Sequence, residues 1–200
     1  KSGISIPLTI KVRTGWDHES RNTHQVTQIA YDEGVTWVAI HGRTRAAAYT
    51  GLADWEYIRE VKAGSKVPVI GNGDIHSADM ARRRLGESGC DAVMIGRGCL
   101  KNPRIFSEAR GLDHEESYET ILNRLLEHLS AFYDERLTLI QMRKFAAWYS
   151  AGHAGAAAFR KDLFQIQDRD EVLGRIKDFF CSTGFQQDTS HEPFLMGGHG

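Results

Sequence analysis

Short apolar runs alternate with helical patterns through the first half of the chain. The runs are rich in Val and Ile, and the segments between them repeat apolar residues at helical spacing. Such alternation is typical of βα units that form a parallel sheet, so we expect an α/β fold. The predicted strands are Leu8–Val12, Trp37–His41, Val67–Gly71 and Ala92–Gly96.

The helices between these strands are predicted from their apolar faces and their end residues. We expect Thr23–Glu33, Trp55–Lys62 and Ala78–Leu85 to be helical. Asp54 and Ser77 have short polar side chains that suit the N-cap position. The residues expected to face the sheet are Val26, Ile29, Ala30, Ile58 and Val61, and the glycines expected to close the helices are Gly34, Gly64 and Gly89.

The pattern changes after Gly111, because no further strand-like run follows. Apolar residues at helical spacing continue to about Phe180 and predict a small all-helical bundle. The apolar stripes are Leu122, Leu125, Leu126, Leu129, Phe132 and Tyr133; then Phe145, Ala146, Trp148 and Tyr149; then a helix over Ala156–Gln167; then Val172, Ile176 and Phe179. We therefore expect a sheet domain over 1–111, a helical domain over 112–181 and a disordered tail over 182–200.

The composition is that of an ordinary globular protein. Of the 200 residues, 41% are hydrophobic and 26% are charged, and the formal net charge is −1. No apolar run approaches the roughly 18 residues that a membrane helix needs, and the first residues lack the layout of a signal peptide. These features predict a cytoplasmic protein that does not bind membranes. With a net charge near zero, any contact with nucleic acid must rest on local basic patches.

The cysteines give no sign of a metal site. Cys90, Cys99 and Cys181 form no C-x-x-C pair. We interpret Cys90 and Cys99 as small core or loop residues. The terminal Gly-Gly-His-Gly could attract a metal ion, but an unstructured terminus is the favoured interpretation. We therefore predict no metal site.

Gly-rich turns follow the third and fourth predicted strands. Gly71-Asn72-Gly73-Asp74 ends the third strand, and Gly96-Arg97-Gly98 ends the fourth. Glycines let backbone amides approach an anion, Arg97 adds a charged donor, and a helix that begins near Ser77 adds its dipole. Consecutive turns of this kind are typical of the phosphate site formed by the last βα loops of a (βα)8 barrel. A phosphate-binding site is therefore predicted here.

Basic side chains lie at the ends of the first two strands. Lys11 and Arg13 are separated by one residue, so on a strand they face the same side, towards a pocket at the strand ends. A solvated sheet edge is the alternative interpretation. His41 closes the second strand and is followed by Gly42 and Arg43, where it could bind phosphate or a flavin edge. A structural histidine explains the same pattern equally well.

Six motifs carry a resemblance to a known family. They are IKVRTGW from Ile10, IHGRTR from Ile40, YxGxADW from Tyr49, IGNGD from Ile70, MIGRG from Met94 and MRKFAAWY from Met142. In order and spacing they resemble the bacterial tRNA-dihydrouridine synthases, most closely the B subtype. The last motif resembles the signature of that family's helical domain, and the resemblance extends from residue 1 to about residue 180.

The resemblance implies a reaction and a set of site residues. In that family, FMN reduced by NADPH passes hydride to C6 of a uracil in tRNA, and a cysteine acid protonates C5, which reduces the 5,6 double bond. The residues implied in FMN binding are Lys11, His41, Asn72, Gly73, Asp74, Gly96 and Arg97. The residues implied in contacts with tRNA or the target uridine are Arg13, Arg43 and Arg45. In the helical domain, Arg143 and Lys144 form with Arg160 and Lys161 two basic pairs on consecutive predicted helices, which could make one patch for phosphate. An ordinary solvated face is the alternative, but the resemblance favours a contact with tRNA.

The sequence departs from the family pattern in two ways. The family's cysteine lies in an Asn-x-Gly-Cys-Pro turn, which is absent, so no catalytic residue is assigned in this sequence. A (βα)8 barrel needs eight βα units, and four are found. We therefore expect the C-terminal half of a barrel and its helical domain, as an inactive fragment of a longer protein that carries the cysteine in its other half.

Three functions are compatible with the sequence. The first is an FMN-dependent tRNA-dihydrouridine synthase of which this chain is a part. The second is a non-catalytic tRNA-binding module. The third is another FMN barrel oxidoreductase acting on a small molecule, against which the helical motif around Arg143 argues. The sequence specifies neither which uridine is reduced nor the oligomeric state, for which a monomer of the full-length protein is one option.

Overall fold

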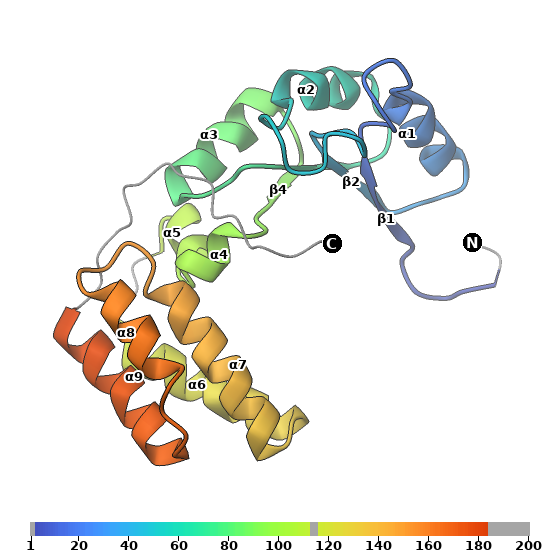
Figure 1. Ribbon diagram of the computed structural model, residues 1–200. Helices are drawn as coiled ribbons and strands as arrows, with labels where there is room; N and C mark the ends of the chain where they lie inside the picture. The colour runs from blue at the N-terminus through green and yellow to red at the C-terminus, as the bar shows by residue number, and fades with distance from the viewer. Residues whose placement is uncertain (1–2, 113–115, 184–200) are drawn as a thin grey trace. The chain divides into compact units, whose positions relative to one another are not determined.

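The computed structural model describes residues 3–112 and 116–183. Within these ranges the chain forms two compact units, the first ending at Gly98 and the second beginning at Cys99 (Figure 1). Most of the predicted tail over 182–200 lies outside the described residues, which end at Thr183.

The first unit contains a parallel sheet of four strands whose neighbours follow the chain order, β1-β2-β3-β4. The strands are β1 (Thr9–Arg13), β2 (Trp37–His41), β3 (Val69–Asn72) and β4 (Ala92–Met94). The helices that connect them are α1 (Thr23–Asp32), α2 (Trp55–Gly64) and α3 (Ala78–Ser88), and they lie along one face of the sheet (Figure 1). A parallel sheet in chain order with helices on one face is consistent with part of a (βα)8 barrel.

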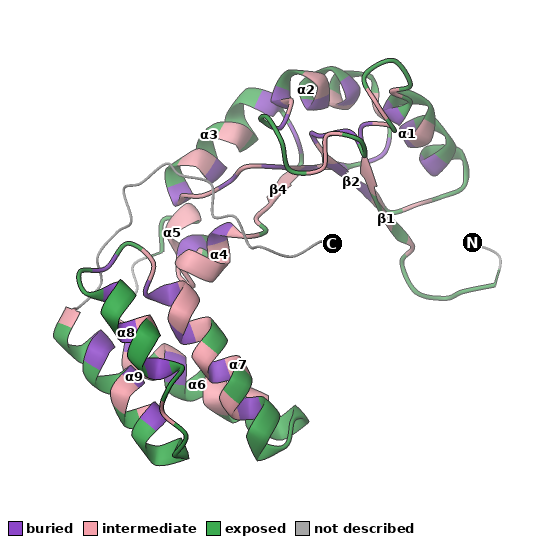
Figure 2. Ribbon diagram, viewed as in Figure 1, coloured by how far each residue is buried: buried purple, intermediate pink, exposed green. Residues whose placement is uncertain are grey.

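Buried apolar residues of the strands and helices form the core of this unit; Figure 2 colours the buried residues purple. Val38, Ile40 and Val69 from the strands are fully buried, as are Ile58 and Val61 from α2. Burying one such side chain stabilises the fold by about 1.5–3 kcal/mol. The predicted inward face of α2 is therefore confirmed.

The capping predictions for α2 and α3 are also confirmed. The side chain of Asp54 accepts a hydrogen bond from the backbone N–H of Tyr57, and that of Ser77 accepts one from Met80. Each bond satisfies an N–H that has no partner within the first turn of its helix.

The predicted inward face of α1 is wrong in part. Ala30 is buried as predicted, but Ile29, also predicted to face the sheet, is 60% exposed, and α1 buries Thr23 and Thr27 as well. The buried Thr23 hydroxyl donates to the carbonyl of Thr14 at 3.0 Å, so this polar side chain has a partner inside the protein.

Gly34 and Gly89 adopt the left-handed conformation expected at helix ends, with φ of 69° and 64°. Gly64 does not, because α2 passes through it and ends in extended backbone at Ser65. The helix therefore ends without the predicted left-handed residue.

The second unit is helical throughout the part that the structure describes. Its helices are α4 (Gly98–Lys101), which begins at the unit boundary, α5 (Ile105–Ala109), α6 (Tyr118–Phe132), α7 (Glu135–Tyr149), α8 (Ala156–Leu163) and α9 (Arg169–Thr183). Helices α6 to α9 share one apolar core, in which Phe159 and Phe179 stack with ring centroids 4.0 Å apart. None of the described helices has the length and apolar composition needed to cross a membrane.

The predicted stripe on α6 extends too far. Leu122 is buried, but Phe132 is 84% exposed and Tyr133 is 46% exposed. Tyr133 is the C-cap of α6, so the stripe runs past the end of the helix and beyond the shared core. Helix α8 is shorter than predicted and ends at Leu163, because the chain leaves helical geometry before Gln167.

Candidate functional site

The polar residues at the strand ends lie on the sheet face opposite the helices. Strand pairing aligns Arg13 with His41 and His41 with Asn72. Residues paired in neighbouring parallel strands project to the same side, and the next residue along a strand projects to the other. Gly71 faces Trp55 of α2. Arg13, His41 and Asn72 therefore form one row at the carboxyl ends of three strands, away from the helices.

A hollow of about 220 Å³ lies at these strand ends. Sites that enclose a whole small molecule usually measure about 300–1,000 Å³, so this hollow has the size for one end of a ligand. Its lining consists of Lys11, Arg13, His41, Tyr49, Asn72, Gly73, Asp74, Ile75, His76, Gly96 and Arg97. All the residues that the sequence assigned to FMN thus lie around one hollow, together with Arg13.

The charges around the hollow favour an anion. Lys11, Arg13 and Arg97 outnumber the carboxylate of Asp74 in the lining. Burial and the positive charge of Arg13 lower the pKa of Lys11. Burial, with repulsion from Lys11 and Arg13, lowers the pKa of His41 to about 4. His41 is therefore uncharged near neutral pH, and the lysine and arginines supply the attraction for an anion.

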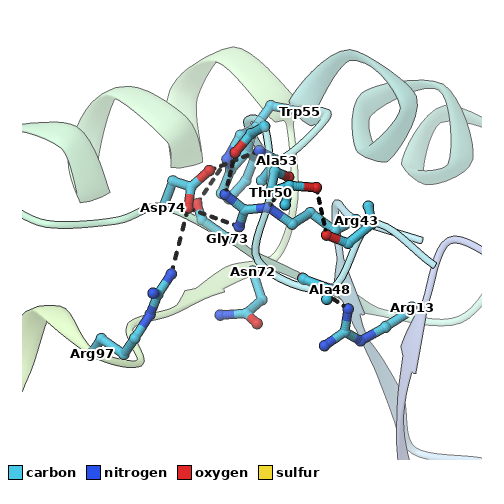
Figure 3. A network of polar contacts seen from close by, with 12 residues as sticks. Arg13, Arg43, Ala48, Thr50, Ala53, Trp55, Asn72, Gly73, Asp74 and Arg97 are labelled. Atoms are coloured by element: carbon cyan, nitrogen blue, oxygen red, sulfur yellow. Dashed lines mark hydrogen bonds and ion pairs between the residues drawn. The ribbon is translucent and has the colours of Figure 1, made fainter. Parts of the chain in front are cut away.

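Asp74 anchors the turn that follows β3 (Figure 3). One carboxylate oxygen accepts a hydrogen bond from Arg43 at 2.8 Å and lies 3.7 Å from a guanidinium nitrogen of Arg97. The other oxygen accepts from the backbone N–H of Ala53 at 2.7 Å. Burial alone would raise the pKa of Asp74, but the bonds from Ala53 and Arg43 hold it below its usual range. The carboxylate thus binds groups of the protein itself.

Close packing explains the glycine at position 73. A Cβ atom there would lie 2.4 Å from the Cβ of Ala53, and the backbone has a φ of 137°. The indole N–H of Trp55 donates to the carbonyl of Gly73 at 2.9 Å (Figure 3). The amide of Asn72 donates to the carbonyl of Met94 at 2.7 Å and so links β3 to β4. The turn is therefore fixed from both sides, with its backbone close to the hollow.

Arg43 is 4% exposed and holds the segment over 44–53 in place. Besides its bond to Asp74, its guanidinium donates to the carbonyls of Thr50 and Gly51 at 3.2 and 2.6 Å. An arginine with these partners acts within the protein by linking the segment to the turn after β3.

Arg13 supports the same segment from β1. Its guanidinium donates to the carbonyls of Thr44 and Ala48 at 2.9 and 3.0 Å. Arg45 is exposed and lies outside the lining of the hollow. Of the three arginines that the resemblance assigned to tRNA in this unit, two thus contact backbone carbonyls of one segment.

Comparison of the sequence with protein-family models identifies one family. The model of the dihydrouridine synthase (Dus) family matches residues 1–183. The chain belongs to the Dus family. This match confirms the family resemblance drawn from the six motifs.

Known members of the Dus family resemble the chain over most of its length. A tRNA-dihydrouridine synthase B from Pseudomonas aeruginosa is 37% identical over 190 residues, or 89% of this chain and 56% of the relative. A probable tRNA-dihydrouridine synthase from Rickettsia bellii is 38% identical over 191 residues, or 90% and 58%. A tRNA-dihydrouridine synthase B from Xanthomonas axonopodis pv. citri is 39% identical over 186 residues, or 88% and 56%. The chain spans little more than half the length of these relatives.

In the helical unit of this Dus chain, the two residues assigned to tRNA differ in their surroundings. The guanidinium of Arg143 donates to the carbonyl of Ile166 at 2.6 Å, which ties α7 to the segment after α8. Lys144 is exposed, and its ammonium lies 5.0 Å from the ring centroid of Trp148. Lys144 is thus available to an external phosphate, whereas Arg143 contacts the backbone.

Sequence reasoning missed three residues that line the hollow: Tyr49, Ile75 and His76. In the sequence, Tyr49 is the first residue of the YxGxADW motif. That motif is the signal that could have identified it, because it lies in the loop after a strand end that carries Arg43 and Arg45. In the part of the chain that the structure describes, no group of His, Cys, Asp and Glu side chains could hold a metal ion.

Proposed function

We propose that this chain is part of an FMN-dependent tRNA-dihydrouridine synthase that reduces the 5,6 double bond of uridine in tRNA. The observation that carries the proposal is the match of the Dus family over residues 1–183. NADPH is the proposed reductant, and the cytoplasm the proposed location. The printed names of the relatives, which include tRNA-dihydrouridine synthase B, support tRNA as the substrate. The family match argues against another FMN oxidoreductase acting on a small molecule.

The first unit is proposed to be the C-terminal half of a (βα)8 barrel. Its parallel strands in chain order and its single layer of connecting helices support this assignment. The helices after it are proposed to form a tRNA-binding bundle. The proposed functional division assigns 1–111 to the barrel part and 112–181 to the helical part, so the barrel part also takes in residues 99–111 of the second compact unit.

The hollow at the strand ends fits the phosphate end of FMN. Its size suits a phosphate group, its lining carries more positive than negative charge, and the backbone at Gly73 is packed without a side chain. When bound, FMN supplies the hydride for reduction of the uracil ring. The residues proposed to hold FMN are Lys11, His41, Asn72, Gly73, Asp74, Gly96 and Arg97. Among these, Asp74 and Asn72 keep the turn in shape, and Arg97 and the backbone bind the phosphate.

The proton donor is proposed to lie outside this sequence. Cys90 is buried on the helix-covered side of the sheet, where its sulfur would lie 3.2 Å from a Cβ on Gly71. Burial also raises the pKa of the Cys90 thiol. A thiol on the wrong face of the sheet cannot reach a uracil at the strand ends.

The tRNA-facing residues are proposed to act in two ways. Arg45 and Lys144 are exposed and can contact phosphates directly. Arg13, Arg43 and Arg143 instead order the backbone segments that face the RNA, because their guanidinium groups donate to carbonyls. Substituting a residue of either set would weaken tRNA binding. Only substitution of Arg13, Arg43 or Arg143 would also change the local structure.

The proposal is tested by substituting Arg97→Ala in the full-length protein. Loss of a charge-assisted bond to phosphate should weaken FMN binding by about tenfold or more, measured by quenching of flavin fluorescence. Arg59→Ala is the matched control, because Arg59 is 57% exposed on α2 and pairs only with Glu56 among the described contacts. Equal FMN affinity of the Arg97→Ala and unsubstituted proteins would refute the phosphate assignment.

If the full-length protein is colourless and gains no flavin absorbance after addition of FMN, the cofactor proposal as a whole is contradicted. If that colourless protein still bound tRNA in a salt-dependent manner, it would instead be a tRNA-binding module without redox activity.

A further inference from the structure

Tyr49 places an aromatic ring at the edge of the hollow. The side chain is 44% exposed and is part of the lining. Its ring centroid lies 4.9 Å from the central guanidinium carbon of Arg97 and 6.0 Å from that of Arg13. A guanidinium within about 6 Å of an aromatic ring is attracted by the negative face of the ring. The neighbours of Arg97 thus include the ring of Tyr49 and the carboxylate of Asp74.

The backbone on both sides of Tyr49 is held by buried or half-buried arginines. The carbonyl of Ala48 accepts a hydrogen bond from Arg13, and the carbonyl of Thr50 accepts one from Arg43. Ala48 has a φ of 48°, a conformation that needs support from its surroundings in a residue other than glycine. Although the ring is exposed, the backbone that carries it is therefore constrained.

We propose that Tyr49 is a positioning residue that holds Arg97 in place for an anionic phosphate in the hollow. A free arginine side chain loses conformational entropy when it binds a ligand, and a side chain that is ordered beforehand loses less. A ring contacts the flat face of a guanidinium, whereas the N–H donors point outwards in its plane and can still meet an oxygen. The ring can thus order Arg97 without replacing the phosphate. This inference rests on the proposed FMN site.

The test compares FMN with riboflavin, which has the same ring system but no phosphate. Dissociation constants are measured by flavin fluorescence for the full-length protein and for Tyr49→Leu and Tyr49→Phe. We expect Tyr49→Leu to weaken FMN binding about three- to tenfold and to leave riboflavin binding unchanged. Tyr49→Phe keeps the ring and should keep the preference for FMN.

Two further variants separate positioning from a general effect on the fold. Tyr31→Leu is the matched control, because Tyr31 is 49% exposed and carries Lys66 at 5.4 Å from its ring, outside the hollow. It should leave both flavin affinities unchanged. In an Arg97→Ala background, Tyr49→Leu should cause no further loss of FMN affinity, since the residue that it positions is gone.

A ligand-free signature gives an independent readout. The ring current of Tyr49 should shift the NMR signal of the Arg97 side-chain N–H, and this shift should be lost in Tyr49→Leu and kept in Tyr49→Phe. An unchanged preference for FMN over riboflavin in Tyr49→Leu, in a protein that binds FMN, would overturn the positioning role alone. Failure of the unsubstituted protein to prefer FMN over riboflavin would overturn the proposed phosphate site together with it.

Discussion

At the scale of the residue, the same side-chain type has different tasks in different places. Arg43 is buried and bonded to Asp74 and two carbonyls, whereas Arg45, next but one in sequence, is exposed. The motif that contains both gave them one role, because a string of residue types does not show which donors find a partner inside the protein. Burial and hydrogen bonding distinguish an arginine that orders the protein from one that can meet RNA.

His41 gives a prediction at this scale. Its pKa in the folded protein is about 4, against about 6.5 in an unfolded chain. Between these values the unfolded chain binds more protons, so the free energy of unfolding should be fully maintained above about pH 6.5 and should fall as the pH drops towards 4. An NMR titration of the imidazole checks the midpoint, with His41→Gln used to assign the signal. A midpoint near 6.5 would show that His41 is solvated and that the hollow does not suppress its charge.

At the scale of the element, the turn after β3 requires a residue without a side chain at position 73. Gly73→Ala would place a Cβ 2.4 Å from that of Ala53 at a φ of 137°. We expect the free energy of unfolding to fall by about 1–3 kcal/mol, measured by urea denaturation. Gly86→Ala is the control, because Gly86 lies within α3 and a Cβ there meets nothing within 4 Å.

The control should raise the stability by about 0.5–1 kcal/mol, because alanine favours the helix more than glycine does. Opposite signs for the two substitutions would show that the glycine at position 73 is required by packing, and equal signs would contradict that reading.

The helices α6 to α9 depend on their shared core. Phe159 is fully buried and stacks on Phe179, whereas Phe164 at the end of the same helix is 57% exposed. Phe159→Ala should lower the stability of the helical unit by about 3–5 kcal/mol, and Phe164→Ala by much less. Helical circular dichroism during thermal unfolding measures both. Similar losses for the two variants would mean that α8 does not pack as described.

At the scale of the whole molecule, the net charge of −1 leaves any binding of RNA to local positive charge. Lys144→Ala should weaken tRNA binding and lower by about one the slope of log affinity against log salt, as expected for one lost phosphate contact. Filter binding at several salt concentrations measures the slope. Lys66→Ala is the control, because Lys66 lies before β3, at the end of the sheet opposite the hollow. A slope unchanged by Lys144→Ala would remove this lysine from the proposed RNA contact.

Much of the fold could be predicted, because the signals are local. The βα alternation, the caps at Asp54 and Ser77 and the buried face of α2 all follow from residues within one or two turns of each other. For α1 the burial of Ala30 could be predicted in the same way, but the burial of Thr23 and the exposure of Ile29 could not. The hydroxyl of Thr23 finds its acceptor at Thr14, outside the helix, and spacing within the helix does not reveal that partner.

The sequence by itself determined the order of the elements, the glycines at the strand ends and the membership of the Dus family, because each depends on residue type and spacing. Only the tertiary structure decided which side chains meet. The register of the sheet aligned Arg13, His41 and Asn72, and contacts across 31 and 35 residues of chain directed Arg13 to the carbonyls of Thr44 and Ala48. A donor binds the nearest suitable acceptor in space, and distance along the chain does not reveal which acceptor that is.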